Sequence, residues 1–145
     1  MEIIKIQIKS ESGYGPVEES YKDKLVLTRE SIAYEFVPYC ESKCERIHKW
    51  NYKTNSLIFA SLYSQICEVI PRYLDSDEIL YCTDIGPTDL VVTYKDKSRK
   101  TEHFYCPSEF FRDLFILVRK MIPPCEDIPV SLILDDDEFE DLPFN

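Results

Sequence analysis

Two segments of the chain place apolar residues at the spacing of a helix. Residues 56–71 (SLIFASLYSQICEVIP) and 108–123 (SEFFRDLFILVRKMIP) align without a gap, and both begin with Ser and end with Ile-Pro. A Ser hydroxyl can cap the unpaired N–H groups of a first helical turn, and Pro cannot continue a helix. The spacing i, i+3, i+4, i+7, i+11 is one face of an amphipathic helix, so we predict two such helices. The matched apolar pairs are Phe59 and Phe111, Leu62 and Leu114, Tyr63 and Phe115, Ile66 and Val118, Ile70 and Ile122.

Runs with the shorter period of a strand surround both helices. Before the first helix they lie at residues 2–12, 24–28, 31–37 and 47–53; before the second they lie at 77–82, 89–94 and 100–105. The polar stretch KDKSRK, residues 95–100, suits a hairpin loop, and a Gly-Pro turn precedes each helix. We interpret this order as an internal duplication of a β-rich unit plus a helix. The first unit covers about residues 1–74 and the second about 77–123.

The order of these elements predicts the fold class. Short strands joined by tight turns favour antiparallel pairing, and strand runs that each end in a helix favour an α+β arrangement. We therefore predict a two-layer sandwich, a mainly antiparallel sheet with both helices on one face. A chain of 145 residues usually holds one core, so residues 1–134 are predicted to form a single domain, followed by an acidic, flexible tail at 135–145.

Charge and cysteine content narrow the functional classes. The formal net charge is −10, which argues against general affinity for nucleic acid and fits a soluble protein or one that meets a basic partner. The N-terminal residues alternate apolar and charged side chains, unlike a signal peptide, and no window is apolar enough to span a bilayer. We predict a cytoplasmic protein with no membrane partner, whose six Cys are mostly reduced.

The segment YCESKCERIHKW raises the question of a metal site. Cys40, Cys44 and His48 are evenly spaced and are good zinc ligands, but a structural zinc site usually needs four ligands. The competing interpretation places Cys40 and Cys44 in a polar connection. His48 then shares the aromatic side of a strand with Trp50 and Tyr52, at the edge of the core.

Two further groups of residues carry side chains that can take part in catalysis or metal binding. His103 lies close to Cys106, but in a strand it projects opposite to Phe104, toward solvent. Asp84 and Asp89 flank a Gly-Pro pair and could bind a cation, although Asp beside Gly-Pro is typical of tight turns. Neither group predicts a catalytic or metal site, and no cofactor is expected.

The C-terminal segment mixes acids with apolar side chains. Six of the seven residues from 135 to 141 are acidic, which is typical of a solubilising tail. The mixture also resembles short linear motifs that dock an apolar residue into a partner. The candidate docking residues are Asp135, Asp136, Asp137, Phe139, Leu142 and Phe144.

These patterns favour a non-catalytic protein-binding or accessory module. The support is the acidic balance, the apparent duplication, the aromatic-bearing tail and the lack of a recognisable catalytic constellation. The alternative is a small metal-binding protein or a thiol-dependent enzyme that uses Cys40, Cys44 and His48. A homodimer formed by pairing of exposed sheet edges is a third hypothesis.

Overall fold

The computed structural model describes residues 2–12, 20–40, 47–74, 86–106, 108–124 and 126–134. Within these ranges the chain forms six strands, two α-helices and two short 3₁₀ helices. In chain order they are β1 (Ile3–Glu11), β2 (Tyr21–Thr28), β3 (Ser31–Pro38), β4 (His48–Lys53), α1 (Leu57–Leu74), β5 (Thr88–Tyr94), β6 (Arg99–Phe104), η2 (Ser108–Phe111), α2 (Arg112–Arg119) and η3 (Val130–Leu132).

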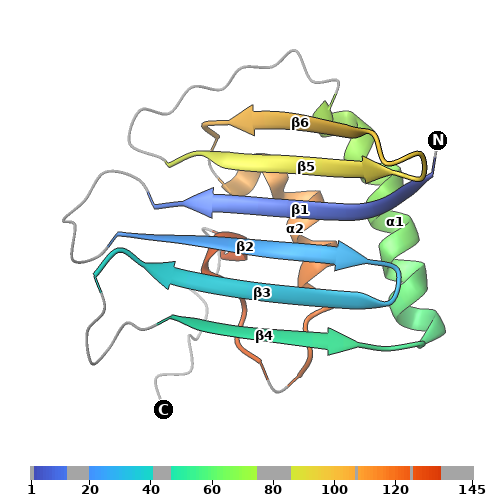
Figure 1. The fold of residues 1–145 in the computed structure, drawn as a ribbon, viewed down its shortest axis with the longest axis horizontal. Helices are drawn as coiled ribbons and strands as arrows, with labels where there is room; N and C mark the ends of the chain where they lie inside the picture. The colour runs from blue at the N-terminus through green and yellow to red at the C-terminus, as the bar shows by residue number, and fades with distance from the viewer. Residues whose placement is uncertain are drawn as a thin grey trace.

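The six strands form one antiparallel sheet in the order β4-β3-β2-β1-β5-β6. The first four strands are a meander, and the chain then passes through α1 before β5 pairs with the free side of β1. Both helices lie behind the sheet when the sheet faces the viewer (Figure 1). The predicted α+β fold with an antiparallel sheet is therefore confirmed. The duplication stays a prediction, because the strand-like run at 77–82 lies outside the described residues.

The helix boundaries differ from those predicted. Pro71 was expected to end the first helix, but α1 continues through it to Leu74. Pro71 removes only one backbone hydrogen bond from the last turn. The extension buries Tyr73, whose ring packs on Phe110 and Phe111 at centroid distances of 5.5 and 5.6 Å. The second predicted helix is shorter, because its first turn is the 3₁₀ helix η2 and the α-helix begins at Arg112.

The core lies between the sheet and the helices. Ile6 on β1 is opposite Leu27 on β2, which is opposite Ile32 on β3, and all three are fully buried. Of the ten helix positions paired in the sequence, eight are buried, while Leu62 and Ile122 are half-buried against the core. Burying a side chain of this size contributes about 1.5–3 kcal/mol. The helices therefore fix which face of the sheet is closed to solvent.

One glycine allows the start of β5 to pack closely against the end of β1. Gly86 precedes β5 and lies against the end of β1, where an added Cβ would be 2.0 Å from the carbonyl oxygen of Glu11. The neighbouring backbone bond, from the Glu11 N–H to the Pro87 carbonyl, is 3.1 Å long. Only glycine leaves room for this approach.

The two edge strands carry basic residues, Lys49 and Lys53 on β4 and Arg99 and Lys100 on β6. Such charges usually discourage edge-to-edge pairing. Among the described residues, no helix has the length and apolar character needed to cross a membrane.

Candidate interaction surface

The side of the sheet that faces away from the helices is uncovered by any described helix (Figure 1). We call it the open face. Strand alternation assigns to it every second residue, and the register aligns these residues in rows across the sheet. Their identities are Lys5, Gln7, Lys9, Glu11, Lys22, Lys24, Val26, Thr28, Ser31, Ala33, Glu35, Val37, Lys49, Asn51, Lys53, Asp89, Val91, Thr93, Arg99, Thr101 and His103.

The open face is basic although the chain is acidic. It holds seven Lys or Arg and three Asp or Glu, a local excess of four positive charges. Because the whole chain has a net charge of −10, the remaining residues together carry −14. None of the seven cations forms a salt bridge within the described residues. The charges of this protein are therefore segregated, a feature that the net charge alone conceals.

Two adjacent rows on the open face have opposite character. One row crosses all six strands with only ionisable side chains, in the order His103, Asp89, Lys9, Lys24, Glu35 and Lys49. The next row crosses the same strands with none, in the order Thr101, Val91, Gln7, Val26, Ala33 and Asn51. Gln7 and Val91 in the neutral row are buried, so its accessible part on the central strands lies on β2, β3 and β4. There a charged row beside a neutral, partly apolar one can recognise a segment that carries both kinds of side chain.

A shallow groove lies where these two rows cross strands β2, β3 and β4. Its volume is about 380 Å³, and we call it the β2–β4 groove. Ala33 is the smallest side chain in its lining, with Val26 and Asn51 opposite it on the two neighbouring strands. Lys24 and Lys49 flank the single carboxylate, Glu35, so the groove keeps one excess positive charge.

A second groove of about 370 Å³ lies at the end of the sheet where β1 ends and β5 begins. Its open-face lining includes Lys9, Lys24, Glu35, Asp89 and His103. Positive and negative side chains are balanced there, so this groove has no clear preference for an anion or a cation. It is the less selective of the two.

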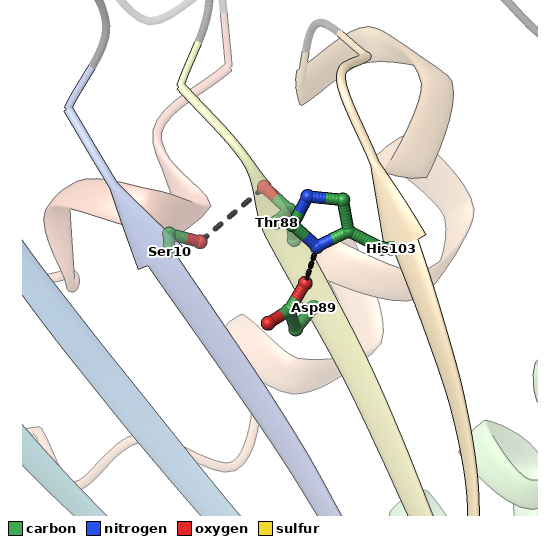
Figure 2. A network of polar contacts seen from close by, with 4 residues as sticks. All are labelled: Ser10, Thr88, Asp89 and His103. Carbon is green, nitrogen blue, oxygen red and sulfur yellow. Dashed lines mark hydrogen bonds and ion pairs between the residues drawn. The ribbon is translucent and has the colours of Figure 1, made fainter.

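The second groove contains a histidine paired with a carboxylate. His103 Nδ1 contacts Asp89 Oδ1 from the neighbouring strand, as Figure 2 shows. Ser10 and Thr88 share a 3.4 Å hydrogen bond in the same view. However, the strand alternation places Ser10 and Thr88 on the helix-covered side and Asp89 and His103 on the open face. The two hydroxyls are thus not arranged as a nucleophile for His103, and the predicted solvent-facing position of His103 agrees with its half-exposed side chain.

The residues of the predicted metal site are only partly described. Cys40 follows β3 and is exposed, whereas Cys44 lies outside the described residues. His48 begins β4 and stacks on Phe36, with ring centroids 5.0 Å apart and planes at 18°. In the described part of the chain no three His, Cys, Asp or Glu side chains are grouped as metal ligands. The metal or thiol alternative on Cys40, Cys44 and His48 therefore stays a prediction.

A half-buried thiol lies elsewhere, on α1. Cys67 lines a hollow of about 390 Å³ together with Arg29, Tyr94 and Lys100. Burial raises the pKa of the Cys67 thiol, and a hydrogen bond with Tyr63 and the charge of Arg29 only partly oppose this. A thiol with a raised pKa is protonated near neutral pH and is a poor nucleophile.

Asp23 is a buried carboxylate on the helix-covered side of β2, and sequence inspection missed it. Its Oδ2 accepts hydrogen bonds from the Tyr34 hydroxyl at 2.8 Å and from the Ser131 N–H at 3.3 Å. Asp23 Oδ1 and the Ser131 hydroxyl have no partner among the described residues. Burial raises the pKa of Asp23, and these hydrogen bonds lower it to a smaller extent. The signal was present in the alternation of YKDKLVLT, where Asp23 shares its side with Leu25 and Leu27.

Asp23 also anchors η3, the last described helix. The bond from Ser131 holds η3 against β2, and Leu132 and Leu134 are buried on either side of Ile133. The candidate docking residues Asp135, Asp136, Asp137, Phe139, Leu142 and Phe144 follow directly and lie outside the described residues. Comparison with known proteins adds no relative, since neither a protein-family model nor a curated protein matches this chain.

Proposed function

We propose that this protein is a non-catalytic protein-binding module and that the open face is its binding surface. The observation that carries the proposal is a set of seven basic residues that form no salt bridge with any described residue and lie beside a row of uncharged side chains. Unpaired surface lysines contribute little to stability, so their concentration on one face is better explained by recognition. The partner surface would combine carboxylates with apolar side chains.

A polypeptide suits this surface better than a nucleic acid. Proteins that bind single strands on a sheet stack the bases on exposed aromatic rings. The six described strands place no Phe, Tyr or Trp on the open face; their aromatic residues lie on the helix-covered side. The overall charge of −10 would also repel a phosphate backbone outside the immediate contact.

The acidic composition fits a soluble protein or one that meets a basic partner, and the segregation of charge favours an acidic partner instead. A partner that approaches the open face meets a local excess of positive charge, and one that approaches elsewhere meets the −14 of the remaining residues. We propose that the partner binds the open face. A cytoplasmic location belongs to the same proposal, because Cys40 and Cys67 are thiols, as is usual in a reducing compartment.

Affinity capture with matched charge-reversal variants tests this function. The bait proteins are wild type, Lys24→Glu/Lys49→Glu in the β2–β4 groove, and Lys95→Glu/Lys120→Glu, which makes the same change of net charge at exposed positions away from the open face. Quantitative mass spectrometry of captured proteins from the native cells is the readout, with circular dichroism as a check on folding. We expect wild type and the second variant to capture the same partner, and the groove variant to lose it at least about tenfold.

The Lys95→Glu/Lys120→Glu control separates an effect of net charge from an effect of position. Equal loss from both variants would show that only net charge matters. Equal capture by all three proteins would place the contact away from the β2–β4 groove. Equal loss would reject the open face as the binding surface, and equal capture would reject the β2–β4 groove as the contact.

A further inference from the structure

The chain carries a segment with the composition that its own open face should recognise. Residues 135–145 (DDDEFEDLPFN) contain six carboxylates interleaved with Phe139, Leu142 and Phe144. The β2–β4 groove offers Lys24 and Lys49 beside Val26 and Ala33. The charges are complementary, and both sides combine ionic with apolar groups. This match, like the inference built on it, rests on the proposed function of the open face.

The described chain ends on the helix-covered side of β2, a strand whose other side borders this groove. Ser131 is bonded to Asp23 on β2, and Leu134 is buried three residues further on. Lys24 and Val26 are one and three residues from Asp23 along the same strand, a span of about 10 Å at 3.3 Å per residue. The eleven residues after Leu134 can extend about 36 Å. The segment is therefore long enough to pass around the end or edge of the sheet and lie on the open face.

We propose that the acidic segment 135–145 folds back onto the β2–β4 groove of its own chain and occupies it until a partner displaces it. Its carboxylates pair with Lys24 and Lys49, and one of its apolar side chains covers Val26 and Ala33. A short tether gives an effective concentration in the millimolar range, so even a weak intrinsic contact fills the groove. The segment then sets a threshold that a partner must exceed, and it excludes weakly acidic competitors.

Nuclear magnetic resonance of the full chain tests the proposed contact directly. The comparison is between wild type and a tail-neutral variant, Asp135→Asn/Asp136→Asn/Asp137→Asn/Glu138→Gln/Glu140→Gln/Asp141→Asn. We expect amide shift differences to cluster at Lys24, Val26, Ala33 and Asn51 and to disappear in 0.5 M NaCl, where the Debye length is a few ångströms. Differences confined to residues 126–134, or located on the helices, would overturn the proposal.

Dilution separates the chain's own segment from that of a second copy. Contact within one chain predicts shifts that are independent of protein concentration. Shifts that weaken on dilution would overturn the proposal in favour of exchange between two copies. Light scattering on the same samples gives the oligomeric state.

A competition measurement tests how strongly the chain's own segment blocks the β2–β4 groove. A synthetic peptide of sequence DDDEFEDLPFN is titrated by calorimetry into wild type and into the tail-neutral variant. We expect about tenfold tighter binding to the variant, because its groove is empty. A control peptide with Phe139, Leu142 and Phe144 replaced by Ser should bind more weakly. Equal affinity for the two proteins would overturn the proposal.

Failure of this inference is distinguishable from failure of the proposed function. Capture experiments with the tail-neutral variant provide the distinction. A partner that is lost by Lys24→Glu/Lys49→Glu but held equally by wild type and the tail-neutral variant would leave the open face as the binding surface and remove the self-docking. A partner held more strongly by the tail-neutral variant supports both.

Discussion

The two faces of the sheet are built from alternate residues of the same strands, and they differ in almost every property. On β2, Leu25 and Leu27 are fully buried against the helices, while Lys24 on the open face is exposed. The helix-covered face concentrates the apolar contacts of the core, and the open face concentrates cations that form no salt bridge with another described residue. The fold is therefore stabilised from one side of the sheet, which leaves the composition of the other side free to serve recognition.

Truncating Leu25 and Lys24, which are neighbours on β2, should show this difference with the largest effect on stability. Leu25→Ala removes a fully buried side chain and leaves a cavity, so we expect a loss of about 2–5 kcal/mol in the free energy of unfolding. Lys24→Ala, one residue away on the open face, should change it by less than about 0.5 kcal/mol. Chemical denaturation of both variants provides the measurement. Comparable losses would mean that the open face is also structural.

Gly86→Ala tests the close approach of the segment before β5 to the end of β1. The new Cβ would overlap the backbone oxygens of Glu11 and Ser12, at 2.0 and 2.5 Å, and backbone atoms cannot rotate aside. We expect a loss of about 1–3 kcal/mol, typical of overpacking, measured by thermal or urea unfolding. A neutral effect would show that the approach of β5 to the end of β1 is looser than described.

Asp23 is a buried carboxylate on the otherwise largely apolar helix-covered face. We expect it to make stability depend on pH, with a smaller effect than Leu25→Ala or Gly86→Ala. Because burial raises its pKa, the folded state binds the proton more tightly than the unfolded state does. The stability that this proton contributes is therefore complete at pH values below the pKa of Asp23 in the unfolded chain. It is lost as the pH rises through the pKa of Asp23 in the folded protein. Asp23→Asn stays uncharged, so its stability relative to wild type should increase between pH 4 and pH 7. Urea denaturation across this range checks the sign.

Tyr34→Phe is the matched control for Asp23. It removes the 2.8 Å hydrogen bond that opposes the rise in the pKa of Asp23 and leaves the aromatic packing in place. The pH dependence should then become steeper than in wild type. Parallel stability profiles for wild type, Asp23→Asn and Tyr34→Phe would show that the carboxyl does not titrate differently on folding.

The sequence predicted most of the helix-covered face and little of the open one. Apolar periodicity identified all six strands and the core positions of α1, because burial imposes a regular pattern. It did not anticipate that α1 continues through Pro71, since the gain comes from contacts of Tyr73 with η2. The basic face was hidden because its residues come from six strands whose order no local pattern reveals. Lys9 and Lys24, for example, become neighbours only through the register of β1 with β2.

The smallest predicted effect concerns this last pair. Lys9 faces Lys24 on one side and Asp89 on the other, and side chains directly opposite in a sheet interact by about 0.2–1 kcal/mol. Double-mutant cycles with Gln at the Lys positions and Asn at Asp89 should give an unfavourable coupling for Lys9 with Lys24 and a favourable one for Lys9 with Asp89. Both should shrink in 0.5 M NaCl. The sign of the first coupling bears on the comparison of the two faces: repulsion at the centre of the charged row is a cost to folding that a bound carboxylate would relieve, whereas a favourable coupling would make the open face a stabilised surface that needs no partner.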